Sequence, residues 1–357
     1  MTGKKANLVS DELARAGTDP ALIDSLKKDR ITTDKELPPM EFLMTLFDVP
    51  SCPRGELVAY TGKAKSGKTF VMSMLMAAAA APKVLAFSRN TIEPLKVVWI
   101  DTEQSDQSTQ DILRNRLVPM VCSPTPAPAP TKGGEFPEGL YDIFNIRIES
   151  WQERMPLVMA AIDLCRPDLV ILDGIRDLVD DINDGRLAHE VTEKLLKVAQ
   201  ATRCCIVCVI HQNKAAEDKT LRGTIGSELT NKAFEVYECE KMMPSRTFVV
   251  TQKHTRKYDI EQPLYFTVDE RGLPRQVGEA AATACEQPLQ DLTTLFVRAF
   301  NGQARLSGEE LRNRVMVALG MSSFKTYGNL LARAIEEDVI CQWKENRRIY
   351  YSLAGPA

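Results

Sequence analysis

A glycine-rich segment at residues 62–69 has the composition and spacing of a phosphate-binding loop. It matches the pattern G-x-x-x-x-G-K-S/T at every fixed position. Its eight residues are Gly62, Lys63, Ala64, Lys65, Ser66, Gly67, Lys68 and Thr69. Backbone N–H groups of such a loop surround phosphate oxygens at a helix N-terminus, where the helix dipole favours negative charge. The spacing predicts a site for ATP and Mg²⁺, with Lys68 at the terminal phosphates, the Thr69 hydroxyl on the metal and Phe70 beside the loop.

The residues on either side of the loop support this interpretation. Residues 57–60 form an apolar run that predicts a buried strand, and residues 70–81, rich in Met and Ala, predict a helix. Strand, glycine-rich loop and helix is the order in which phosphate-binding loops occur. A chance match in a lysine-rich turn is the alternative, and it does not account for this order.

Acidic groups follow two buried strands further along the chain. The apolar run 169–172 ends at Asp173, and the run 97–100 is followed by Asp101 and Glu103. Ligands of open α/β sheets bind at the carboxyl ends of the strands, so we expect these side chains near the loop. We predict that Asp173 is the second Mg²⁺ ligand and that Glu103 orients water, because Asp101 directly continues its strand. The alternative is a carboxylate that only ends a strand or begins the next helix.

Polar residues also follow the buried run 204–210. His211 and Gln212 are placed to sense the γ-phosphate and to transmit its loss to the next loop. A strand-end histidine held by hydrogen bonds is the alternative. The loop at 214–226 carries Lys214, Lys219 and Arg222 with two glycines, which favours contact with DNA. A solvated surface loop has the same composition.

A second cationic segment follows a strand late in the alternating pattern. Lys253 and Arg256 lie there, and a cation at this position could reach the site of a neighbouring subunit. It would neutralise negative charge that develops in the transition state of phosphoryl transfer. A run of surface charge is equally compatible with these residues.

The bulk composition is that of an ordinary globular protein, and 357 residues allow one large and one small domain or two medium ones. The net charge of −3 gives no global basic field, so nucleic-acid contact must use local patches. Every apolar run is too short for a bilayer and residues 1–5 lack a signal core, so we expect a cytoplasmic protein without membrane contact. The cysteines suit a reducing compartment, and Cys204, Cys205 and Cys208 fit a buried strand better than a metal site.

Strand and helix patterns alternate between residues 38 and 277. This predicts an α/β fold, with a mostly parallel sheet covered by helices on both faces. Residues 1–37 are predicted to be a helical arm, residues 124–130 an exposed Pro-rich loop, and residues 278–287 a linker. Shorter strands predict an antiparallel extension of the sheet. They lie at residues 234–239, 247–251 and 264–268.

The segment at 288–357 has an organisation of its own. Three helical patterns, the second opened by Ser307 and Glu310 as a capping box, and a final hairpin predict a small winged-helix domain. Such domains commonly place the third helix in the major groove of DNA. The cations available for DNA are Lys325, Lys344, Arg347 and Arg348. Acidic residues dilute this charge, so a module for protein contacts or for packing alone is the alternative.

Together these residues resemble the RecA-like ATPase superfamily, and most closely the RepA-type hexameric helicases of plasmids and mobile elements. The resemblance covers about residues 38–275. It depends on segments in the same order and spacing. These are the loop at 62–69, residues 100–103, residues 172–173 with 182–184, residues 211–214, residues 222–224, and Lys253 with Arg256.

The resemblance implies a RecA-like core that hydrolyses ATP with Mg²⁺, a homo-oligomeric ring, expected to be a hexamer, and single-stranded DNA within that ring. It also implies that Glu103 activates water, that the region of His211 couples nucleotide to DNA, and that Lys253 or Arg256 acts in trans. The chain departs from the family in four ways. It has His211 and Gln212 where a pair of His is usual, a Lys-x-x-Arg spacing where Lys-x-Arg is usual, the C-terminal module, and a Pro-rich insertion that lengthens the gap between the loop and Asp173.

Three functions are compatible with this sequence. The first is a ring-forming, DNA-dependent ATPase, a helicase or translocase for replication or mobilisation of a plasmid or mobile element, with duplex DNA as a second partner at the winged helix. The second is an ATP-switched DNA-binding regulator or loader that does not unwind DNA. The third is a scaffold ATPase that recruits a protein partner.

Overall fold

The computed structural model describes residues 19–122, 136–212, 221–243, 247–279, 282, 292–318, 324–346 and 348–354. The chain divides into two compact units, Met1–Glu41 and Phe42–Ala357. In the first unit, α2 (Pro20–Asp29) begins where Asp19 caps it by accepting a hydrogen bond from the Ala21 N–H at 2.9 Å. No residue of α2 is buried. The predicted Pro-rich loop at 124–130 lies outside the described residues.

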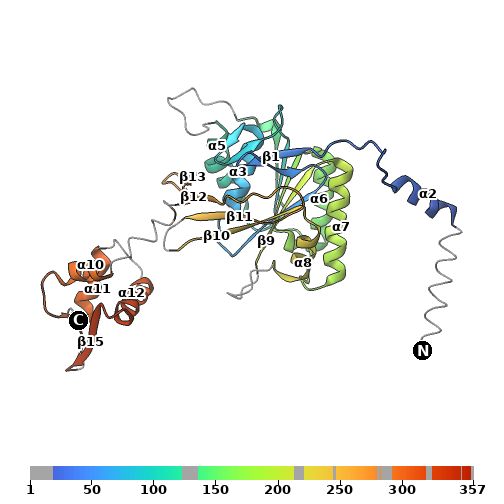
Figure 1. Ribbon diagram of the computed structural model, residues 1–357. Helices are drawn as coiled ribbons and strands as arrows, with labels where there is room; N and C mark the ends of the chain where they lie inside the picture. The colour runs from blue at the N-terminus through green and yellow to red at the C-terminus, as the bar shows by residue number, and fades with distance from the viewer. Residues whose placement is uncertain are drawn as a thin grey trace, which may run out of the picture. The chain divides into compact units, whose positions relative to one another are not determined.

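The second unit is built on a nine-stranded sheet with the strand order β13-β12-β11-β10-β3-β9-β8-β6-β7 (Figure 1). The strands are β3 (Leu57–Gly62), β6 (Val97–Asp101), β7 (Tyr141–Asn145), β8 (Leu169–Asp173), β9 (Cys205–His211), β10 (Glu235–Lys241), β11 (Phe248–Thr255), β12 (Leu264–Val268) and β13 (Pro274–Val277). The six strands from β10 to β7 are parallel, and β11, β12 and β13 are antiparallel. The predicted α/β fold with a mostly parallel sheet and an antiparallel extension is confirmed.

Helices cover both faces of this sheet, as predicted (Figure 1). They are α3 (Lys68–Ala80), α4 (Asp106–Ile112), α5 (Val118–Cys122), α6 (Trp151–Cys165), α7 (Gly185–Thr202) and α8 (Gly223–Lys232), with short helical turns η1 (Leu113–Leu117), η2 (Glu138–Leu140) and η3 (Ile175–Leu178). Successive strand residues point to opposite faces. Val58 and Tyr60 of β3 therefore join the core around α3, whereas Leu57 and Ala59 join the core around α6, α7 and α8.

One strand pairing differs from the predictions. Strand β10 was expected to begin the antiparallel extension, but it pairs parallel with β3 because the helix α8 precedes it as a crossover. Helix α6 begins at Trp151, because the Glu153 carboxylate accepts hydrogen bonds from the Ser150 N–H and hydroxyl. Pro156 therefore lies inside this helix. Helix α4 continues through the π-helical turn η1 into α5.

A four-stranded sheet near the start of the second unit was not predicted. Its order is β2-β1-β5-β4, from β1 (Phe42–Leu46), β2 (Val49–Pro53), β4 (Lys83–Val84) and β5 (Phe87–Arg89). Strands β1 and β2 are joined through Phe47 and Asp48, both with positive φ, at 51° and 63°. Neither residue is a glycine, and the turn has no Asn-Gly or Asp-Gly pair, so this hairpin lacks the usual local signal.

The C-terminal helices and hairpin surround a small apolar core. The elements are α10 (Leu292–Phe300), β14 (Leu306–Ser307), α11 (Gly308–Ala318), α12 (Phe324–Glu336), β15 (Ile340–Glu345) and β16 (Arg348–Leu353). Phe296, Phe300 and Tyr351 are buried in this core. The predicted capping box at Ser307 is present, since Glu310 accepts from the Ser307 hydroxyl at 2.7 Å. Arg348 is exposed, whereas Arg347 and the Lys325 side chain lie outside the described residues.

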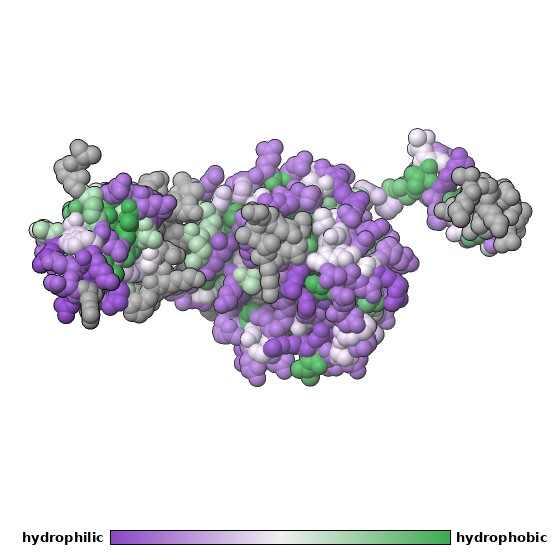
Figure 2. Space-filling model, turned by 90° about the horizontal axis from the view of Figure 1, so that it is seen from below, coloured by the Kyte–Doolittle hydropathy of each residue, from purple (hydrophilic) through white to green (hydrophobic). Residues whose placement is uncertain are grey.

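Hydrophilic residues dominate the face of the molecule seen in Figure 2, with apolar residues scattered among them. No helix in the described part of the chain is long and apolar enough to cross a bilayer. Cys204, Cys205 and Cys208 are buried at β9, where they pack as small apolar side chains.

Glu235 joins the small sheet to the large one. Its side chain is fully buried and accepts hydrogen bonds from the Ser51 hydroxyl at 2.9 Å, the Cys52 N–H at 3.2 Å and the Tyr237 hydroxyl at 3.3 Å. Burial nevertheless raises the pKa of Glu235 from 4.5 to about 7. The folded protein therefore favours the protonated carboxyl, and stability falls as the pH rises from about 4.5 to about 7.

We expect Glu235→Gln to remove this pH dependence. Relative to wild type, the free energy of unfolding of the variant should rise by about 3 kcal/mol between pH 4.5 and pH 7.5, as measured by urea unfolding. The exposed Glu270→Gln is the matched control and should change equally at both pH values. If the difference in the free energy of unfolding between Glu235→Gln and wild type were also the same at both pH values, the raised pKa of Glu235 would be contradicted.

Candidate nucleotide-binding site

The phosphate-binding loop connects β3 to α3 as predicted, and neighbouring chain segments fix its shape. Gly67 has a φ of 93°, and a Cβ atom there would lie 2.6 Å from Phe248 Cδ1. Lys65 also adopts a positive φ of 63°. The loop residues 65–70 therefore turn tightly against β11, and α3 begins at Lys68 with its N-terminus facing the loop.

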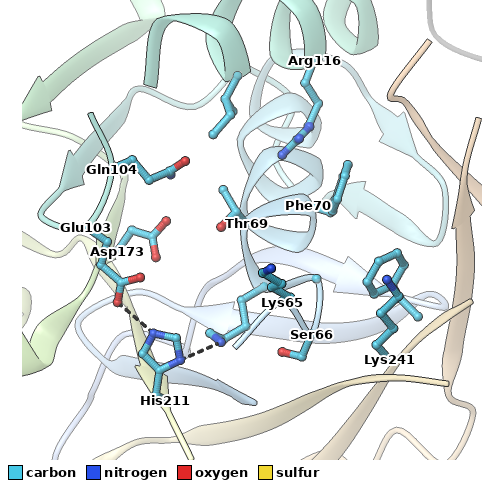
Figure 3. Close-up of a pocket in the computed structure, with 14 residues that line it drawn as sticks. Lys65, Ser66, Thr69, Phe70, Glu103, Gln104, Arg116, Asp173, His211 and Lys241 are labelled. Carbon is cyan, nitrogen blue, oxygen red and sulfur yellow. Dashed lines mark hydrogen bonds and ion pairs between the residues drawn. The ribbon is translucent and has the colours of Figure 1, made fainter. Parts of the chain in front are cut away.

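The polar strand ends meet beside this loop. Gly62 at the end of β3 pairs with His211 at the end of β9, and Asp101 of β6 pairs with Asp173 of β8. A cavity of about 420 Å³ opens at this edge. Its lining is Lys65, Ser66, Gly67, Lys68, Thr69, Phe70, Glu103, Gln104, Ile112, Arg116, Asp173, His211, Lys241 and Phe248 (Figure 3). The structure thus brings the predicted Lys68, Thr69, Glu103, Asp173 and His211 into one cavity.

His211 lies between the loop lysine and the predicted water-orienting carboxylate (Figure 3). Its Nδ1 is 3.2 Å from Lys68 Nζ, and its Nε2 is 3.3 Å from Glu103 Oε1. A neutral imidazole with its proton on Nε2 satisfies both contacts. The hydrogen bond from His211 lowers the pKa of Glu103, and burial lowers the pKa of Lys68. Glu103 is therefore held as an anionic carboxylate, the form that can accept a proton from water.

Asp173 is buried, with only 2% of its surface exposed. Burial, together with the nearby Glu103 and Asp101, raises the pKa of Asp173 from 3.8 to about 8, and Lys68 opposes this rise. In the described part of the chain no group of three or more acidic, His or Cys side chains could form a metal cage. Mg²⁺ is typically held by one or two protein oxygens together with substrate phosphates, and the Asp173 carboxylate and Thr69 hydroxyl suit this arrangement.

Asp101 has a different role from Glu103. It is fully buried, and its Oδ1 accepts hydrogen bonds from the Glu103 N–H and the Gln104 N–H, both at 3.0 Å. Its Oδ2 accepts from the Thr109 hydroxyl at 2.7 Å. Asp101 thus fixes the backbone that carries Glu103, whose side chain lines the cavity.

We expect Asp101→Asn to destabilise the fold and to slow ATP hydrolysis. The new NH₂ group would replace either the acceptor of the Glu103 and Gln104 N–H groups or the charged acceptor of the Thr109 hydroxyl, which costs about 1–3 kcal/mol in the free energy of unfolding. Urea unfolding and single-turnover hydrolysis measure the two effects. Asp106→Asn in the exposed first turn of α4 is the control, and equal stability of the two variants would contradict the anchoring role.

Three further predicted residues, Gln212, Lys253 and Arg256, do not line the cavity. Gln212 is buried and donates a hydrogen bond to Glu238, which also forms an ion pair with Lys253 at 2.7 Å. Arg256 donates to the Asn231 carbonyl at 2.8 Å and to the Ala233 carbonyl at 3.2 Å, at the C-terminal end of α8. Arg222 immediately precedes α8. Lys214 and Lys219 lie outside the described residues.

Five lining residues were not predicted from the sequence, namely Gln104, Ile112, Arg116, Lys241 and Phe248. Ile112 and Arg116 stand four positions apart on the helical segment after Glu103, and this spacing was the available signal. Lys241 and Phe248 come from β10 and β11, whose approach to the loop depends on the strand order and has no local signal.

A family model described as an AAA domain matches residues 33–217, which is more than half of the chain. The chain belongs to this family, and the phosphate-binding loop at residues 62–69 lies within the matched residues. A solved structure of a KaiC-like protein from the hyperthermophilic archaeon Pyrococcus horikoshii OT3 is similar at 12% identity and a TM-score of 0.44, over 64% of this chain and 92% of that one. No curated protein matches the chain.

Proposed function

We propose that this protein is a DNA-dependent ATPase that forms a ring and moves along single-stranded DNA during replication or mobilisation of a plasmid or mobile element. Lys68 and Thr69 bind ATP with Mg²⁺, Asp173 holds the metal, and Glu103 orients the attacking water. Mg²⁺ supplies positive charge that offsets the charge developing on the phosphates. The observation that carries the proposal is a series of contacts that runs from Lys68 through His211 to Arg222.

This line begins at His211, which touches both Lys68 and Glu103. The His211 carbonyl accepts a hydrogen bond from the Arg222 N–H at 3.0 Å, and Gln212 forms an isolated antiparallel β-bridge with Leu221. The described residues that flank positions 213–220 are therefore linked to the strand end that contacts the nucleotide site. A change in the Lys68–His211 contact on ATP hydrolysis would be transmitted to these flanking residues, and Lys214 and Lys219 lie between them in the sequence.

Lys253 is the better candidate for the cation that acts in trans. Its side chain is 41% exposed, and its Glu238 partner also binds Gln212, next to His211. Arg256 is instead engaged by two carbonyl groups at the end of α8, which indicates a structural role. An exposed cation tied to the strand end can leave its partner and enter the site of a neighbouring subunit.

We expect Glu103→Gln and Lys68→Ala each to lower turnover at least about 100-fold, because one removes the water-orienting carboxylate and the other a phosphate contact. Glu103→Gln should still bind MgATP. The test is an ATPase assay with and without single-stranded DNA, beside the mass in solution with a non-hydrolysable nucleotide. Loss of ATP binding by Glu103→Gln would contradict its assignment.

The same assays distinguish the alternative functions. A slow ATPase with affinity for a specific duplex and no unwinding would favour the regulator or loader, with the C-terminal module as the duplex-binding part. An ATPase rate that is indifferent to DNA would favour the scaffold and contradict the proposal. Stimulation by single-stranded DNA together with a ring-sized mass supports the proposal.

A mixing experiment tests the role of Lys253. Lys253→Ala and Lys68→Ala should each be inactive alone, and a mixture should regain activity, because an intact loop then meets an intact Lys253 from another subunit. A mixture with the double variant Lys68→Ala, Lys253→Ala in place of Lys68→Ala is the control and should remain inactive. No recovery in the first mixture, with mixed rings present by mass, would contradict action in trans.

A further inference from the structure

Two aromatic rings lie side by side on the C-terminal hairpin. Trp343 of β15 pairs with Tyr350 of β16, and their ring centroids are 6.2 Å apart with an angle of 25° between the planes. Trp343 is 37% exposed, although burying a ring of this size stabilises a fold more than burying most side chains. The pair plays no part in the ATP hydrolysis proposed above.

Strand geometry places this pair on the face of the hairpin that is turned away from the small core. Side chains two positions apart share a face of a strand, and neighbours point to opposite faces. Ile340 and Tyr351 are buried in the core that the hairpin forms with α10, α11 and α12 (Figure 1). Trp343 stands three positions from Ile340, and Tyr350 is next to Tyr351. Both rings therefore lie on the other face, and among the described residues neither ring belongs to this core.

Positive charge accompanies the two rings. The guanidinium carbon of Arg305 lies 5.1 Å from the centroid of the Tyr350 ring. Arg305 also forms an ion pair with Glu345 at 3.0 Å, and Glu345 pairs across the hairpin with the exposed Arg348. Arg348 is two positions from Tyr350, so it shares the face of the rings. Residues 344–348 contain three cations and one acid, in a chain whose net charge is −3. The hairpin thus combines exposed rings with a local positive charge.

These features favour a single strand of nucleic acid as the partner. Proteins bind single strands by stacking bases on aromatic side chains, with cations along the phosphates and cation–π contacts from Arg. A base inside a duplex must first be unstacked from its neighbours, at an energetic cost that a single strand does not have. Trp, Tyr and Arg are also common where proteins contact one another, but the positive charge of the hairpin complements a phosphate backbone.

We propose that the hairpin binds single-stranded DNA on its aromatic face, which we define as Arg305, Trp343, Arg348 and Tyr350. Bases stack on the two rings, and the two arginines neutralise phosphates. The aromatic face adds a contact for the single strand to the one proposed for the segment after β9. This inference deepens the proposed function and rests on it only for the choice of DNA as the nucleic acid.

The test uses the full-length protein without ATP and two strands of equal length and charge. One is a thymidine strand of about 12 nucleotides, and the other is an abasic strand that keeps the deoxyribose phosphates and has no bases. Binding is measured by the fluorescence anisotropy of a dye on the strand. Stacking is measured by the loss of tryptophan emission when a base covers the indole of Trp343. Trp99 is fully buried and does not report on the strand.

Trp343→Ala should bind the thymidine strand about tenfold more weakly and the abasic strand as well as wild type does, because only a base can stack. Tyr350→Ala should show the same selective loss. Trp343→Phe keeps a ring and should retain most of the affinity, whereas quenching of tryptophan emission should disappear. Ile349→Ala is the matched control, since Ile349 is 42% exposed and lies on the opposite face of β16. It should keep the affinity for both strands and the quenching.

Two outcomes would overturn the proposal. Equal weakening of both strands by Trp343→Ala would show that the ring supports phosphate contacts or the fold, and not stacking. Unchanged affinity, with unquenched emission in wild type, would show that the aromatic face does not bind DNA and would leave it to a protein partner or to packing. Failure of the proposed function has a different signature. An ATPase rate that is indifferent to single-stranded DNA contradicts the translocase, and selective quenching by the thymidine strand would persist.

Discussion

The parallel register of four neighbouring strands is the constraint on which the candidate site depends. β3, β9, β8 and β6 end at one edge of the sheet, where Gly62 pairs with His211 and Asp101 with Asp173. A slip of one residue would exchange the two faces of each strand, and the apolar residues of these strands are buried on both faces in separate cores. Hydrophobic packing therefore fixes where the polar side chains stand, and the site inherits its geometry from the core.

This geometry concentrates negative charge around one buried lysine. Asp101 accepts hydrogen bonds from N–H and O–H groups, and the hydrogen bond from His211 lowers the pKa of Glu103. Burial, together with the repulsion from Glu103 and Asp101, raises the pKa of Asp173 to about 8. A divalent cation beside Asp173 would relieve this repulsion. The electrostatics and the phosphate-binding loop thus point to the same metal–nucleotide chemistry.

Local patterns predicted the parts of the site that lie within single segments. The loop at 62–69 and the strand ends at Glu103, Asp173 and His211 were predicted because each follows a continuous apolar run. The change from apolar to polar residues marks the end of the strand in the sequence itself. Arg116 and Phe248 were missed because they reach the cavity through a π-helical turn and through strand order. The β1–β2 hairpin was missed because Phe47 and Asp48 make its turn without a glycine. In each case tertiary contacts, and not propensity, decide the backbone.

Strands β10 and β11 contact the phosphate-binding loop directly, in addition to extending the sheet. Gly62 lies against the Cys239 carbonyl with no room for a Cβ, and Gly67 lies against the Phe248 ring. Glu238, directly before Cys239 on β10, binds both Gln212 and Lys253. The two strands therefore contact the phosphate-binding loop and Gln212, and β11 itself carries the exposed Lys253. Because packed cores transmit displacement rather than absorb it, a shift of the loop on nucleotide binding must also displace β10 and β11, and with them Lys253.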